Sequence, residues 1–169
     1  MRHALIALLV ATLLAACGSS TASQAPDADA TGKPSKSMRI GGNIRVLVVD
    51  DSRSEVQYLS ELLTKRGYMV STAENGEMTM KFLAETATDA LPDMILMDIV
   101  LPGENGFQLS RRITRDERYQ QIPIILMTSP DQETDKIWAG RQGVRDYVGK
   151  PVNPDELQVK MKDILGVAP

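Results

Sequence analysis

The chain has 169 residues, 24% of them charged, and a formal net charge of −3, proportions that suit one soluble globular domain. This mild acidity and the presence of only two phenylalanines argue against a nucleic-acid-binding surface, which needs basic and stacking side chains. One cysteine and one histidine exclude an internal disulfide and a zinc site built from several Cys or His ligands, so we expect carboxylates to carry the chemistry.

The N-terminal segment has the pattern of a bacterial leader peptide. A positively charged start precedes an apolar run from Ala4 to Leu14, which is too short to span a membrane as a helix. The run closes with Leu14-Ala15-Ala16-Cys17, which resembles the lipobox of bacterial lipoproteins and implies cleavage before Cys17 and lipidation of its thiol. The small and polar residues that follow predict three parts: a leader (1–17), a disordered linker (18–42) and a folded domain (43–167).

Beyond residue 43, short apolar runs alternate with segments of helical periodicity, which is typical of βαβ units and a parallel sheet. Strands are predicted at residues 45–50, 69–73, 94–98, 122–127 and 146–148. Helices are predicted from Ser52, which forms a capping box with Glu55, to Gly67, then over 77–85, 106–115 and 132–142, and after Asn153. The fold class is therefore α/β, with a parallel sheet of five strands and five helices in alternation.

Charged and hydroxyl side chains follow these strands at the points where the strands end. Asp50 and Asp51 end the first apolar run, Asp98 ends the third, Thr128 follows the fourth, and Lys150 lies just beyond the fifth. Because ligands bind at the carboxyl ends of parallel strands, we expect these groups to converge. Three carboxylates in contact repel one another unless a cation compensates them, and Mg²⁺ suits a site with few carboxylates and a phosphoryl group. The pattern indicates phosphoryl transfer onto an aspartate.

Four motifs in this order resemble the receiver domain of bacterial two-component response regulators. They are Asp50-Asp51-Ser52, Asp98 with Pro102 and Gly106, Thr128-Ser129, and Lys150-Pro151. The resemblance covers about residues 43–166 and implies a doubly wound, flavodoxin-like parallel sheet of strand order 2-1-3-4-5, flanked by five helices. The stretch 131–147, together with residues 97–100 and 106–108, is similar to the stand-alone regulators of type IV pilus twitching motility, the PilH-like group.

The resemblance implies how the acidic residues divide the work. Asp98 accepts a phosphoryl group from the phosphohistidine of a histidine kinase. Asp51 binds Mg²⁺ directly, Asp50 assists through water, and Asp98 and the backbone carbonyl of Val100 complete the protein's ligands.

The same resemblance implies how the signal leaves the site. Thr128 and Lys150 bind the phosphoryl group, and Tyr147 turns inward as the aromatic member of the switch. A downstream protein then binds the face formed by the helix at 132–142, the strand at 146–148 and the last helix. We expect no output domain after that helix, so the chain is a switch and a phosphorylation substrate rather than an enzyme in its own right.

Two alternatives stay open at this point. A lipidated protein outside the cytoplasm has no ATP-fed kinase within reach, so the chain could be a membrane-anchored binding module that is not phosphorylated. A metal-dependent aspartyl phosphatase is less favoured, because haloacid-dehalogenase-type enzymes carry a second aspartate where this chain has Val100. We expect a cytoplasmic protein, with translation starting at Met38, and a membrane contact only if the leader is real.

Overall fold

The computed structural model of the protein describes residues 44–129 and 143–166. The predicted leader with Cys17, the linker and the predicted helix at 132–142 lie outside these residues. Among the helices that are described, none is long and apolar enough to cross a membrane.

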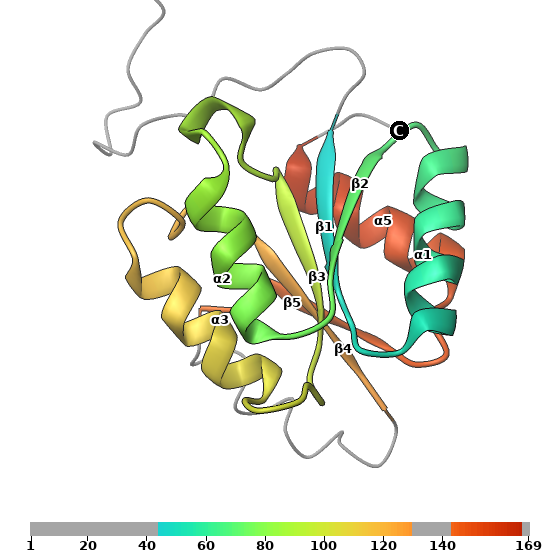
Figure 1. Cartoon of the computed structure of the whole chain (residues 1–169). Coiled ribbons are helices and arrows are strands. Elements are labelled where there is room, and N and C mark those ends of the chain that lie inside the picture. Colours follow the sequence, from blue (N-terminus) through green and yellow to red (C-terminus); the bar gives the residue numbers. More distant parts are fainter. Residues whose placement is uncertain (1–43, 130–142, 167–169) are drawn as a thin grey trace, which may run out of the picture. The chain divides into compact units, whose positions relative to one another are not determined.

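Five parallel strands form one sheet in the order β2-β1-β3-β4-β5 (Figure 1). Their bounds are β1 Arg45–Val49, β2 Met69–Ala73, β3 Met94–Asp98, β4 Ile124–Thr128 and β5 Asp146–Gly149. The doubly wound sheet and its strand order confirm the predicted fold class. The prediction for β4 began too early, because Pro123 has no N–H to donate and the strand starts at the next residue.

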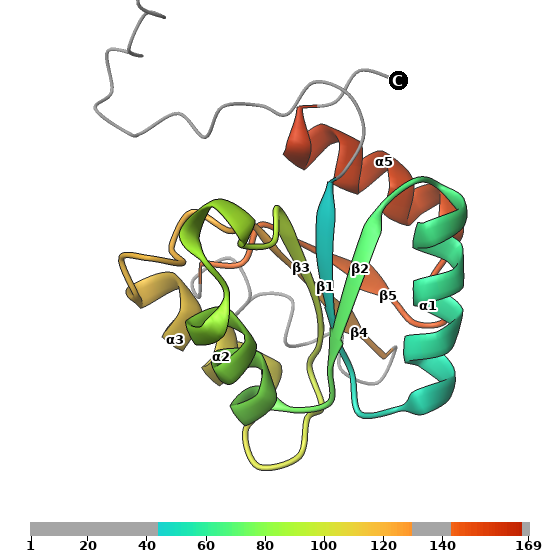
Figure 2. The ribbon, with the colours of Figure 1, turned by 45° about the horizontal axis from the view of Figure 1, so that its top comes forward.

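The helices lie on both faces of the sheet. They are α1 Arg53–Lys65, α2 Gly76–Glu85, α3 Gly106–Arg115 and α5 Pro154–Leu165, with a short 3₁₀ helix at Thr88–Ala90 that the sequence pattern did not predict. In two views, α1 and α5 cover one face, and α2 and α3 cover the other (Figures 1 and 2). This arrangement leaves the carboxyl ends of the strands to the loops that carry the candidate site.

The core has two layers because alternate residues of each central strand face opposite sides of the sheet. Leu47 and Val49 belong to the layer under α2 and α3, whereas Val46 and Val48 belong to the layer under α1 and α5. All five residues of β3 are buried, which is typical of a strand covered on both faces. Each fully buried aliphatic side chain stabilises the fold by roughly 1.5–3 kcal/mol, so the strand ends are held in a rigid frame.

Side-chain hydrogen bonds cap the N-termini of α1 and α3, and at α1 a competing hydrogen bond replaces half of the predicted capping box. Ser52 caps α1 by accepting from the Glu55 amide at 3.5 Å, as predicted. The reciprocal bond of the predicted capping box is absent from the described contacts, because the Ser52 amide donates instead to Asp50 Oδ1 at 2.9 Å. A complete capping box occurs at α3, between Asn105 and Gln108, where the sequence analysis had not placed one.

Candidate functional site

Asp50 is fixed at the bottom of the site by two hydrogen bonds. It follows β1 directly and is completely buried. Its Oδ1 accepts from the Ser52 amide, and its Oδ2 accepts from Lys150 Nζ at 2.7 Å. A buried carboxylate needs such partners, because an unpaired one costs several kcal/mol of solvation free energy. The loop after β1 is thereby tied to the loop after β5.

Asp98 is the last residue of β3 and is 7% exposed, so one edge of its carboxylate reaches the surface of the protein. Lys150 Nζ lies 3.2 Å from its Oδ2. The start of α3 is packed hard against the same residue: the Gly106 amide donates to Ile99 O at 2.7 Å, and a Cβ on Gly106 would collide with the Asp98 carbonyl oxygen. Glycine at position 106 therefore allows α3 to begin beside the candidate acceptor.

The three carboxylates predicted to converge do so. One oxygen each of Asp50, Asp51 and Asp98 lies within 4.8 Å of the others, and Asp51 is the solvent-exposed member. Oxygens on opposite sides of a Mg²⁺ ion are about 4.2 Å apart, given metal–oxygen distances near 2.1 Å. The three oxygens can thus approach one small hard cation with slight movement, and the exposed side leaves room for water and a phosphoryl oxygen.

The charges in this cluster shift two pKa values. Burial raises the pKa of Asp98, and the negative charge of Asp50 raises it further, although Lys150 and a backbone hydrogen bond from Val100 act in the opposite direction. Burial lowers the pKa of Lys150, but its hydrogen bond and charge interaction with Asp50, together with Asp98, outweigh burial and raise it. Lys150 is therefore charged at neutral pH, whereas burial and the charge of Asp50 make the ionised form of Asp98 unfavourable in the folded protein.

Thr128 lies at the end of β4 and is almost completely buried. Its hydroxyl donates to the Ser129 carbonyl at 3.1 Å, and its own carbonyl accepts from the Lys150 amide at 2.7 Å. The latter bond joins the two loops that carry the predicted phosphoryl-binding side chains. The Lys150–Pro151 peptide bond is cis.

The two remaining predicted site residues lie at the edge of the cluster. Val100 is 54% exposed, and its backbone makes a hydrogen bond to the Asp98 carboxylate. The predicted role of its carbonyl as a metal ligand stays a prediction. Tyr147 faces outward on β5, with its ring centroid 5.5 Å from Lys160 Nζ. Lys160 also bonds both carboxylate oxygens of Asp146 at 3.0 Å. Nothing in the sequence pattern pointed to this contact of Lys160.

Comparison of the sequence with known proteins shows which family the chain belongs to. The model of the response regulator receiver domain matches residues 46–162. The chain is 46% identical over 121 residues to Protein PilH of Pseudomonas aeruginosa, an alignment that covers 72% of this chain and 97% of PilH. The chain belongs to the response regulator receiver family. Some relatives are longer: this receiver chain spans 51% of the regulator PhoB of the same species, at 37% identity.

Solved structures agree with this assignment. A putative response regulator from Chloroflexus aurantiacus superposes with a TM-score of 0.68 at 31% identity, over 73% of this chain and 98% of that one. The receiver domain of a Pseudomonas aeruginosa sensor histidine kinase superposes with a TM-score of 0.65 at 26% identity, covering 74% and 99% of the two chains. That structure has a magnesium ion coordinated in its active site cleft. Receiver domains bind Mg²⁺ in their acidic pocket, and the donor set of this receiver suits the same ion.

Proposed function

We propose that this receiver is a phosphorylation-operated switch in which Asp98 accepts a phosphoryl group from a histidine kinase. The observation that carries the proposal is the meeting of Asp50, Asp51 and Asp98 with one ammonium at the carboxyl edge of the sheet. No purely structural need accounts for three mutually repelling carboxylates at that place.

In the proposed reaction, a carboxylate oxygen of Asp98 attacks the phosphorus of the donor phosphohistidine. The new P–O bond makes an acyl phosphate, and the P–N bond breaks with its electron pair returning to the imidazole. Asp51 would hold Mg²⁺ directly and Asp50 through water, and the ion would supply positive charge that offsets the charges of the phosphoryl oxygens and the carboxylates. Lys150 exchanges part of its contact with Asp98 for a phosphoryl oxygen.

The phosphoryl group then changes the hydrogen bonding at the end of β4. It offers acceptors for the Thr128 hydroxyl, which now bonds only to the neighbouring Ser129 carbonyl. Rotation of Thr128 toward the phosphoryl group vacates space beneath β5, and Tyr147 moves inward from its exposed position. The shift of this equilibrium presents an altered face, formed by the predicted helix at 132–142 with β5 and α5, to a downstream protein.

The likeness to PilH supports a place in type IV pilus twitching motility, with a histidine kinase of that chemosensory system as donor. We also propose that the phosphorylated form is long-lived. In the family that the chain resembles, the residues two after the acceptor and two after the threonine shape the approach of water to the phosphoryl group, and here these are Val100 and Pro130, whose side chains cannot orient water. Autophosphorylation from small donors and autodephosphorylation are therefore modest. A Val100→Asn variant loaded with acetyl phosphate should lose its label faster than the parent, and equal decay rates contradict this point.

The experiment that tests the switch is labelling with acetyl phosphate and MgCl₂, followed on phosphate-affinity gels. The parent should shift, Asp98→Asn should not, and EDTA should abolish the shift of the parent. Asp93→Asn is the matched control, because Asp93 is a buried acid that immediately precedes β3, at the opposite end of the strand from Asp98. Labelling that persists in Asp98→Asn, or an equal loss in the control, contradicts the proposal.

A second candidate function depends on the N-terminus. The lipobox-like run ending at Cys17 supports a membrane-anchored binding module, whereas the complete acidic set supports a cytoplasmic phosphoprotein, which we propose. Intact mass of the protein from its native cell separates the two. A chain beginning at Met38 supports the cytoplasmic switch, and a lipidated chain beginning at Cys17 supports the anchored module.

A further inference from the structure

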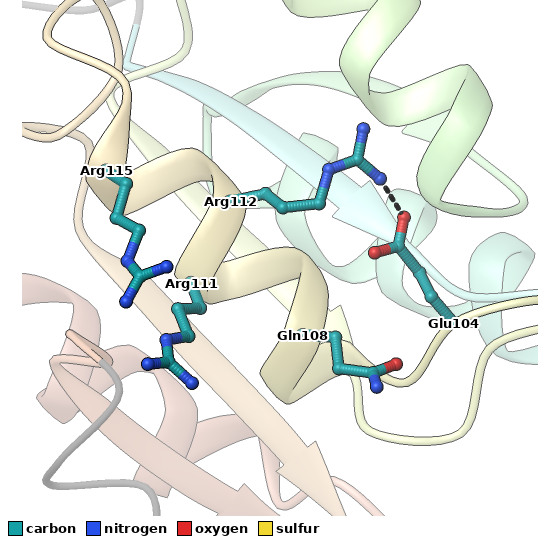
Figure 3. Close-up of a pocket in the computed structure, with 5 residues that line it drawn as sticks. All are labelled: Glu104, Gln108, Arg111, Arg112 and Arg115. Carbon is teal, nitrogen blue, oxygen red and sulfur yellow. Dashed lines mark hydrogen bonds and ion pairs between the residues drawn. The ribbon is translucent and has the colours of Figure 1, made fainter.

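A hollow on the outer side of α3 gathers more positive than negative side chains. Its volume is about 380 Å³, and it is lined by Glu104, Gln108, Arg111, Arg112 and Arg115 (Figure 3). Three guanidinium groups and one carboxylate line the hollow, so it carries a formal charge of +2 in a protein whose net charge is −3. Arg111 and Arg115 project from the same side of the helix in the close-up.

The single acid of the hollow is already engaged. Glu104 forms an ion pair with Arg112, and its side chain is only 21% exposed because it packs over Gly76 at the start of α2. Arg111 and Arg115 make no ion pair with any residue in the described ranges. Two adjacent guanidinium groups with no counter-charge repel each other, and an external anion would relieve that repulsion.

The helix dipole accounts for only part of this charge. A positive residue in the last turn is favoured, and α1 and α5 each have one there. On α3 the last turn has two, Arg112 and Arg115, and Arg111 precedes them. Moreover, α3 is the one helix among those described that contains no acidic residue. Its outer face is therefore charged well beyond what helix stability needs.

The chemistry of the lining selects the partner. No apolar side chain lines the hollow, which disfavours insertion into a membrane, and no aromatic ring is present to stack on a nucleic-acid base. The amides in the middle of a helix are already hydrogen-bonded, so a free phosphate would lack the backbone donors that small-anion sites use. Guanidinium groups, in contrast, bind carboxylates in a planar, two-bonded geometry.

We propose that the α3 face docks an acidic segment of a partner protein, with Arg111 and Arg115 each binding one carboxylate. Residues four apart on a helix are separated by about 6 Å along its axis. Glutamates four apart on a partner helix have the same spacing. This surface lies on α3 and includes no residue of β5 or α5, and the proposal does not depend on phosphorylation of Asp98.

The probe is a labelled alanine-based helical peptide of about 16 residues that carries glutamate pairs at i and i+4. A second peptide of the same composition places each pair at i and i+2, on opposite sides of the helix. Binding is measured by fluorescence anisotropy at low salt. The variant is Arg111→Gln/Arg115→Gln, and the matched control is Lys65→Gln/Lys81→Gln, which removes two positive charges from exposed positions on α1 and α2.

The proposal predicts that the i, i+4 peptide binds the parent and the control within a factor of about two of each other, and binds the arginine variant about tenfold more weakly. The i, i+2 peptide should bind more weakly than the first. Equal loss in the control and the arginine variant reduces the effect to net charge and overturns the proposal. So does binding only to vesicles containing phosphatidylglycerol, or displacement of the peptide by millimolar inorganic phosphate.

Failure of the parent to bind either peptide also overturns the proposal. If thermal unfolding then shows that the arginine variant is less stable than the control, the two arginines pair within the chain. These outcomes differ from failure of the proposed switch, which is read from acetyl phosphate labelling and leaves peptide binding unaffected.

Discussion

Replacing Asp98 with asparagine should stabilise the metal-free protein, although it removes the candidate acceptor. At 4.8 Å, the upper limit of their separation, the repulsion between Asp98 and the buried Asp50 is about 3.5 kcal/mol for an effective dielectric constant of about 20, and the exposed Asp51 adds less because solvent screens its charge. The attraction between Asp98 and Lys150 at 3.2 Å is about 5 kcal/mol on the same scale. The repulsions thus roughly offset this attraction, and the cost of burying the charge, several kcal/mol per ion, makes the ionised carboxylate destabilising in the metal-free protein.

The direction of the pKa shift of Asp98 supports the same expectation. Because burial and Asp50 raise it above its ordinary value of 3.8, ionising this group costs more in the folded chain than in the unfolded chain. Its protonated form thus favours folding below the ordinary pKa, and that contribution is lost as the pH rises through the folded pKa. Asparagine at position 98 is neutral at every pH, so the variant does not lose this contribution to folding stability as the pH rises.

The assay is thermal unfolding followed by circular dichroism, with EDTA and with MgCl₂. In EDTA, Asp98→Asn should unfold roughly 5–10 °C above the parent, and Asp51→Asn should gain less because Asp51 is exposed to solvent. Asp50→Asn should gain nothing, since it loses the bond to Lys150. In MgCl₂ the parent gains stability and the gap narrows, because the ion binds the folded state. A lower melting temperature for Asp98→Asn in EDTA refutes the reasoning.

Three further outcomes are expected. Lys150→Met should destabilise the fold by about 3 kcal/mol in urea titrations, because it leaves the fully buried Asp50 without its ammonium; a loss below about 1 kcal/mol contradicts the importance of that pair. Gly106→Ala should destabilise by about 2 kcal/mol and weaken acetyl phosphate labelling, since its Cβ displaces the start of α3 from Asp98; unchanged labelling refutes this link. Burial raises the pKa of Tyr68 above 10.0, opposed by Arg66, so the tyrosine's contribution to stability is complete below about pH 10 and lost as the pH rises through the folded pKa. Urea titrations of the parent and Tyr68→Phe should diverge in that range, and parallel curves contradict it.

The fold was predictable because its signals are local. Each strand is a short apolar run followed by polar or turn residues. Asn153 caps α5 and Pro154 is its first residue, as the sequence predicted. The convergence of Asp50, Asp51 and Asp98 was predictable for a related reason: each follows a strand, and parallel strands bring their carboxyl ends to one edge.

Other features depend on the positions of the terminal groups of flexible side chains, which local sequence signals do not specify. Nothing in the sequence specified that Lys150 would bond Asp50 more closely than Asp98, because four rotatable bonds separate its ammonium from the backbone. The contact of Lys160 with Tyr147 joins α5 to β5 and has no sequence periodicity. The Ser52 cap was predictable, but its competition with Asp50 for hydrogen bonds required the loop geometry.

The central claim is that the carboxylate of residue 98 forms an acyl phosphate with the help of Mg²⁺. Its most direct test is to label the protein with acetyl phosphate, reduce it with borohydride, and locate the product by peptide mass spectrometry. Borohydride converts an aspartyl phosphate to homoserine, and the account predicts homoserine at position 98 in the sample with MgCl₂ and none in the sample with EDTA. Homoserine at another aspartate, or equal amounts in both samples, contradicts the account.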